Sequence, residues 1–110
     1  MTKIKFFKEK DYYYGFEASG HADGGEYERI VCAGISALTE TFYFSLIELL
    51  GFRDEDIKEE VSDGFLSIKI CENYIDDKVQ FAFKYLILGL KKIDETYPRY
   101  LKLEVWYDKV

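Results

Sequence analysis

The chain's single histidine, His21, and one of its two cysteines, Cys32, lie in one short segment, GHADGGEYERIVCAGIS, which covers residues 20–36. An imidazole beside a thiol can take the thiol proton and leave the ion pair that thiol nucleophiles use. An inert interpretation stands beside this one, because free cysteines are mostly buried and behave as small hydrophobes. A single loop histidine is just as often a surface residue. The spacing of the two residues does not decide between these interpretations.

A long helix is expected to carry Cys32 near its start. From Glu28 onward, apolar residues recur every three or four positions, the spacing of one buried helical stripe: Val31, Ile35, Leu38, Phe42, Leu46 and Leu49. Gly51 is a natural stop. Cys32 would then lie four or five residues into the helix, with Ser36 one turn later on nearly the same face. Amides and the macrodipole near a helix start favour an anion, which would stabilise a thiolate.

The segment that joins His21 to this helix contains two adjacent glycines, Gly24 and Gly25. Glycine permits a sharp turn without strain, so the imidazole can approach the sulfur. We expect residues 22–29 to form a loop that is mobile when empty and orders over a bound peptide.

A metal site does not fit these residues. Structural zinc requires four ligands, and the second cysteine, Cys71, lies in an expected strand with no CxxC or HxxxH spacing. We interpret Cys71 as structural or incidental. The absence of a CxxC motif also argues against a function as a thiol redox protein. No cofactor is expected.

The remaining elements follow from alternation and turn residues. Residues 3–7 and 12–18 are typical of two strands, with Gly15 marking a bulge, and residues 57–61 and 66–70 of a hairpin around Asp63-Gly64. Asp76 or Asp77 can cap a second helix that ends at Tyr97-Pro98, and residues 101–107 alternate as a last strand. The order β-β-α-β-β-α-β predicts one α+β domain over residues 1–110, a single sheet with two helices packed on a face.

The second helix has more apolar surface than one side of a sheet would cover. Phe81, Tyr85, Ile87 and Leu88 lie outside its main stripe. A homodimer would bury them. Alternatively, the first helix covers them within one chain.

Composition narrows the class of protein. The chain has 110 residues, of which 48% are hydrophobic, and a formal net charge of −6 from 21 acidic and 15 basic residues. This charge argues against a nucleic-acid surface and favours a basic partner. The longest nearly uncharged apolar run, residues 85–90, is far short of the roughly 20 residues of a membrane span, and the start lacks a signal-peptide apolar region. We expect a cytoplasmic protein with reduced cysteines.

Two blocks of the sequence resemble the signature of the ribosomal-processing cysteine protease family, Prp. These are Gly20-His21-Ala22 and, about ten residues later, Val31-Cys32-Ala33-Gly34-Ile35-Ser36-Ala37-Leu38. The resemblance implies a cytosolic endopeptidase, typically a homodimer, that removes the N-terminal extension of a basic large-subunit ribosomal protein of the bacterial L27 type. It further implies Cys32 as nucleophile, His21 as general base and Ser36 as a supporting polar residue, without a cofactor.

The sequence departs from this resemblance at one position. Many members carry an acid three residues before the cysteine, where this chain has Arg29. Glu28, Glu26 or Asp23 could substitute, or the enzyme could work as a Cys–His dyad. A non-enzymatic module that binds a ribosomal protein or assembly factor, with Cys32 merely packed, is the alternative function.

Overall fold

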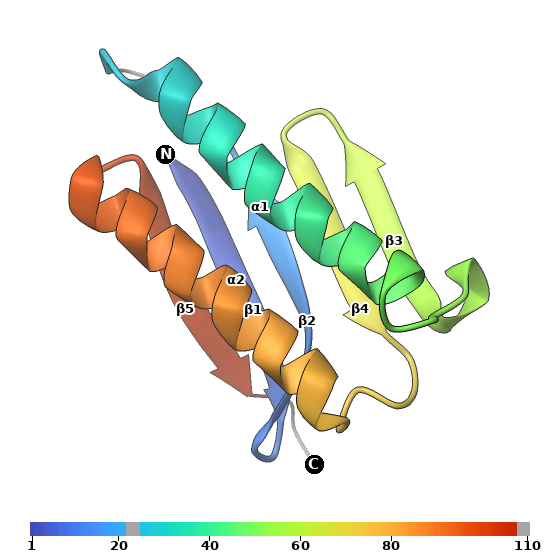
Figure 1. Ribbon diagram of the computed structural model, residues 1–110. Coiled ribbons are helices and arrows are strands. Elements are labelled where there is room, and N and C mark those ends of the chain that lie inside the picture. Colours follow the sequence, from blue (N-terminus) through green and yellow to red (C-terminus); the bar gives the residue numbers. More distant parts are fainter. Residues whose placement is uncertain (22–24, 108–110) are drawn as a thin grey trace.

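The computed structural model describes residues 1–21 and 25–107. Its elements are β1 (Thr2–Glu9), β2 (Tyr12–Ser19), α1 (Glu28–Glu48), the 3-10 turn η1 (Asp54–Asp56), β3 (Ile57–Ser62), β4 (Phe65–Ile70), α2 (Asp77–Thr96) and β5 (Leu101–Tyr107) (Figure 1). The predicted α+β order is confirmed, with η1 as an addition.

The five strands form one mixed sheet in the order β3-β4-β2-β1-β5. β1 runs parallel to β5, and all other neighbouring pairs are antiparallel. Both helices cover the same face of this sheet (Figure 1). The pairing of β2 with β4 matters most for the site, because Ser19 at the end of β2 pairs with Phe65 at the start of β4. The residues after β2 therefore lie beside the β3–β4 turn.

The bulge predicted at Gly15 occurs in β2. Phe7 pairs with Gly15 and Lys8 pairs with Tyr13, so Tyr14 is the extra residue next to the glycine. The prediction that Cys71 lies in a strand is wrong, because β4 ends at Ile70. The N–H of Cys71 instead donates a 3.0 Å hydrogen bond to the carbonyl oxygen of Asp56.

The helices build the core with one stripe each. α1 buries Val31, Ile35, Thr39, Phe42 and Leu46, whereas α2 buries Val79, Gln80, Phe83, Leu86 and Leu90. The rings of Phe42 and Phe83 lie 4.7 Å apart where the helices meet over the sheet. Most of the stripe predicted for the first helix is thus confirmed. Leu49 is 80% exposed because it lies just beyond the end of α1.

α1 is long and apolar enough to cross a membrane by length and composition alone, which the sequence interpretation did not anticipate. A core helix passes the same test. The buried stripe of α1 packs against the sheet and α2, as in a core helix.

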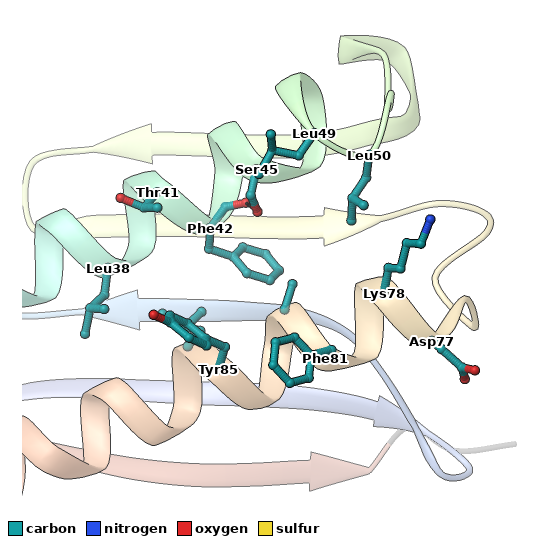
Figure 2. Close-up of a pocket in the computed structure, with 12 residues that line it drawn as sticks. Leu38, Thr41, Phe42, Ser45, Leu49, Leu50, Asp77, Lys78, Phe81 and Tyr85 are labelled. Atoms are coloured by element: carbon teal, nitrogen blue, oxygen red, sulfur yellow. Dashed lines mark hydrogen bonds between the residues drawn. The ribbon is translucent and has the colours of Figure 1, made fainter.

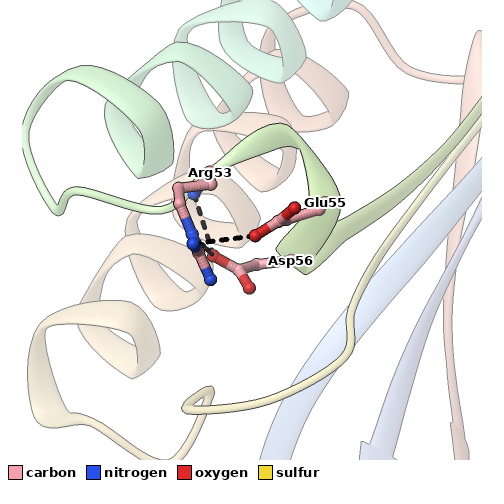
Figure 3. A network of polar contacts seen from close by, with 3 residues as sticks. All are labelled: Arg53, Glu55 and Asp56. Carbon is pink, nitrogen blue, oxygen red and sulfur yellow. Dashed lines mark hydrogen bonds and ion pairs between the residues drawn. The ribbon is translucent and has the colours of Figure 1, made fainter.

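The ends of the elements follow local chemistry. Asp76 is the N-cap of α2, where its side chain accepts a 2.7 Å hydrogen bond from the N–H of Lys78. Between α1 and β3, Arg53 forms an ion pair with Glu55 at 2.8 Å, and its N–H donates to the Asp56 carboxylate at 3.0 Å (Figure 3). This network closes η1 and turns the chain into β3.

Candidate active site

His21 is held at the end of β2 by the neighbouring hairpin. The N–H of Gly20 donates a 2.9 Å hydrogen bond to the carbonyl oxygen of Gly64 in the β3–β4 turn. The imidazole then lies against Gly64, and its Nε2 is 3.8 Å from Oδ1 of Asp63. The His21 side chain is 59% exposed, so it remains accessible to a substrate.

Cys32 and Ser36 come from the first turns of α1. The helix begins at Glu28, so the predicted distance of Cys32 from the helix start and its shared face with Ser36 are confirmed. Cys32 is half-buried and Ser36 is exposed. Helical side chains tilt toward the N-terminus, which aims the sulfur toward the start of the helix.

The amides at this helix start are only partly used. The first bond of the ladder joins the N–H of Val31 to the carbonyl oxygen of Tyr27 at 3.0 Å, so the N–H groups of Arg29 and Ile30 have no partner within α1. The N–H of Cys32 falls inside the ladder. The amides that favour an anion at a helix start therefore lie one turn before Cys32.

His21, Cys32 and Ser36 line one pocket of about 220 Å³. Its walls come from the end of β2, the first half of α1, the start of β1 and the β3–β4 turn, and include Thr2, Ala18, Gly20, Ile35, Thr39, Gly64, Phe65 and Leu66. A thiol, an imidazole and a hydroxyl thus meet in a small hollow with an apolar floor. This arrangement can perform acyl transfer, because a nucleophile and a base share one space.

The other residues proposed from sequence divide into three groups. Asp23 and Gly24 lie outside the described residues. Glu26 and Glu28 are described, at the start of α1, and neither forms an ion pair or hydrogen bond with His21 within residues 1–21 and 25–107. Gly25 lies against the hydroxyl of Tyr100, which fills the space that a Cβ would need. The mobility of residues 22–29 stays a prediction.

Sequence reasoning missed the contribution of the β3–β4 turn. Asp63 and Gly64 were interpreted only as a hairpin turn, yet they contact His21. The signal was the strand order: once β4 is placed beside β2, the turn before β4 must lie beside the residue that follows β2. Thr39 also lines the pocket, but nothing in the sequence singles it out, because it lies between apolar residues of the expected helical stripe.

Metal ligation receives no support from the described part of the chain, in which no group of three or more His, Cys, Asp and Glu side chains could hold an ion. Both Cys32 and Cys71 are free thiols.

The model of the family described as Cysteine protease Prp matches residues 1–102. The chain belongs to the Prp family of cysteine proteases. It is therefore a peptidase, and the resemblance of the two sequence blocks is confirmed at the level of the family. No curated protein matches the chain significantly.

Solved structures agree with this Prp assignment. The essential ribosomal processing protease Prp from S. aureus, in complex with a covalently linked product peptide, is 25% identical, with a TM-score of 0.82 over 96% of this chain and 100% of that one. A crystal structure of SMU.848 from Streptococcus mutans is 27% identical, with a TM-score of 0.76 over 98% and 96% of the two chains. The S. aureus protease has also been solved with a substrate peptide, at 24% identity and a TM-score of 0.82.

Proposed function

We propose that this Prp-family chain is a cytoplasmic endopeptidase that removes the N-terminal extension of a large-subunit ribosomal protein of the L27 type, with Cys32 as nucleophile and His21 as general base. One observation carries the proposal: the thiol and the only imidazole of the chain line the same pocket at the start of α1. The S. aureus relative is a ribosomal processing protease that was captured with a covalently linked product peptide.

The reaction follows from this arrangement. His21 takes the thiol proton, and the Cys32 sulfur attacks the carbonyl carbon of the peptide bond. A carbon–sulfur bond forms, and the protonated imidazole gives its proton to the amine as the carbon–nitrogen bond breaks. Water then attacks the thioester, with His21 taking the water proton, and the free thiol is restored. No step needs a cofactor.

We propose Asp63 as a positioning residue for His21. The acid that many family members carry before the nucleophile is replaced by Arg29 here, and neither Glu26 nor Glu28 forms an ion pair with the imidazole in the described part of the chain. The Asp63 carboxylate lies 3.8 Å from Nε2. Because Asp63 is fully exposed, its attraction for the imidazolium is screened by water. We therefore expect Asp63→Asn to lower turnover only a few-fold.

The charge of the chain supports a basic substrate. A net charge of −6 would speed the encounter with a strongly basic ribosomal protein at low salt.

We also propose that the active protein is a homodimer formed through the α1–α2 surface. Three apolar side chains of α2 are largely exposed: Phe81 at 66%, Tyr85 at 65% and Leu88 at 54%. The alternative that α1 covers them within one chain is therefore wrong for these three residues. Ile87 is half-buried. Phe81 and Tyr85 border a groove of about 650 Å³ between the helices (Figure 2). Large exposed apolar surfaces of this kind mark protein interfaces. Phe81→Glu should shift the sedimentation coefficient to that of a monomer, and a wild type that sediments as a monomer at micromolar concentration would refute the dimer.

The decisive experiment incubates the purified protein with the full-length ribosomal-protein precursor. Wild type should release the N-terminal extension, and Cys32→Ala and His21→Ala should not. Cys71→Ala is the matched control, since Cys71 is the other free thiol and is exposed away from the pocket. Cleavage that survives Cys32→Ala would refute the assignment, and equal binding by all variants without cleavage would favour the binding module.

Ser36 can be tested in the same assay. It is exposed on the pocket wall, so Ser36→Ala should leave the fold intact and lower the rate. Unchanged turnover would reduce Ser36 to a packing role.

A further inference from the structure

A second hollow lies next to the pocket that contains Cys32. It has a volume of about 470 Å³ and lies between α1 and the β3–β4 hairpin. Ser36, Thr39 and Leu66 line both hollows, so the two lie next to each other along α1, and together we call them the trench. We call the second hollow the hairpin groove.

The hairpin groove combines an apolar floor with two carboxylates. Leu66 and Ile68 of β4 form the floor, and Val61 of β3 is a 68% exposed apolar wall. Glu40 of α1 and Glu59 of β3 both line it, and both are exposed. Neither forms an ion pair within the described ranges 1–21 and 25–107, and the groove lining includes no Lys or Arg.

Tyr43, which also lines the hairpin groove, indicates negative electrostatic potential there. Burial raises the pKa of its phenol, and the charges of Glu59 and Asp54 raise it further. The phenol therefore stays neutral and donates a 3.3 Å hydrogen bond to the Asp54 carboxylate. A neutral ring beside unpaired carboxylates suits the aliphatic stem and charged head of a long basic side chain.

We propose that the hairpin groove binds the substrate segment next to the scissile bond, and that Glu40 and Glu59 select a Lys or Arg in that segment. This inference rests on the proposed peptidase function. Its occupant is a basic, extended polypeptide, because the groove shares a wall with the pocket of the nucleophile and its lining carries two carboxylates and no Lys or Arg.

The helix sets the position of that basic residue. Glu40 follows Cys32 by two turns of α1, about 12 Å along the axis at the usual rise per residue. An extended peptide advances about 3.3 Å per residue. The selected Lys or Arg should therefore lie about three or four residues from the cleaved bond.

Binding to a series of synthetic peptides tests this inference. Fluorescein-labelled peptides spanning the cleavage site of the ribosomal-protein precursor carry a single lysine at each position in turn, against norleucine as the uncharged equivalent. Fluorescence anisotropy with Cys32→Ala protein measures the dissociation constants without cleavage. We expect lysine to tighten binding about tenfold at a position three or four residues from the bond.

Two paired variants separate the groove from the overall charge. Glu40→Gln with Glu59→Gln should abolish the preference for lysine. Glu48→Gln with Glu60→Gln removes the same charge from the same helix and strand, outside the groove lining, and should retain it. Equal dissociation constants for lysine and norleucine peptides, no measurable binding, or the same loss in both paired variants would overturn the inference.

Cleavage of these peptides by otherwise unaltered protein tests the proposed function separately. Lysine-dependent binding without cleavage would support the groove and refute the proposed processing of this precursor. Cleavage together with equal dissociation constants would refute the groove and leave the peptidase intact.

Discussion

Gly64 offers a test of the role of His21 that leaves both proposed catalytic residues in place. Gly64 adopts φ +70° in the β3–β4 turn, and a Cβ added there would lie 3.0 Å from His21 Nε2 and 3.5 Å from Cδ2. Gly51 provides a matched control. It adopts φ +76°, and an added Cβ would meet nothing within 4 Å.

The two alanine substitutions should have the same thermodynamic cost and different functional costs. A non-glycine residue in the left-handed region costs about 1–2 kcal/mol, so Gly64→Ala and Gly51→Ala should each lower the free energy of unfolding by about that amount. The added Cβ would lie 3.0 Å from His21 Nε2, whereas ordinary contacts between such atoms are about 3.5–4.0 Å long. The imidazole should therefore move away by about 0.5–1 Å. Misplacement of a catalytic group by about 1 Å can cost about 100-fold in rate.

The measurements are urea unfolding and the rate of precursor cleavage, made on both variants below their unfolding transitions. Gly64→Ala should unfold at nearly the same urea concentration as Gly51→Ala but cleave about 10- to 100-fold more slowly. If Gly64→Ala cleaves as fast as Gly51→Ala, the position of the His21 ring does not control the reaction, and its assignment as general base fails.

Two further predictions concern stability and pH. Gln80 is buried, accepts a hydrogen bond from the Tyr13 N–H and donates to the carbonyl oxygens of Tyr13 and Tyr74. Because Gln80→Leu would leave these backbone groups without a partner, it should lower the free energy of unfolding, measured in urea, by about 2–4 kcal/mol. An unchanged urea midpoint would show that these hydrogen bonds do not stabilise the fold. The hydrogen bond from Trp106 Nε1 lowers the pKa of Glu104 in the folded protein below its ordinary value of 4.5. The ionised Glu104 therefore stabilises the folded state above pH 4.5, and this stabilisation is lost as pH falls through the lowered pKa of the folded protein. Emission of Trp106, the only tryptophan, should change in that acid range and stay constant there in Glu104→Gln.

Local patterns in the sequence were sufficient for the elements and for half of the site. The three- and four-residue spacing after Glu28 predicted α1, and with it the common face of Cys32 and Ser36. The Asp63-Gly64 turn predicted the hairpin of β3 and β4. These features depend on contacts within a few residues, and such contacts are encoded in spacing and turn chemistry.

Features that depend on strand order were beyond that reasoning. The hydrogen bond between Gly20 and Gly64, which holds the residue before His21 against the β3–β4 turn, requires β4 to pair with β2, and nothing in either strand states which neighbour it takes. The contact of Asp63 with His21 has the same origin. Gln80 was not predicted to be buried for a different reason. Its side chain forms hydrogen bonds with the backbone of Tyr13, which is far away in the sequence, and hydrophobic periodicity does not detect such a contact.

The two sides of α1 explain how one small domain can accommodate a substrate and a second copy together. Residues such as Cys32 and Glu40 line the trench toward the β3–β4 hairpin, whereas Leu38 and Thr41 line the groove toward α2. Because a helix presents positions three and four apart on one side, these two sets cannot share a face. A dimer closed over the α2 side would therefore leave the trench open to a peptide. The proposed interface and the proposed substrate path are compatible, and disruption of one through Phe81 should leave peptide binding in the other unchanged.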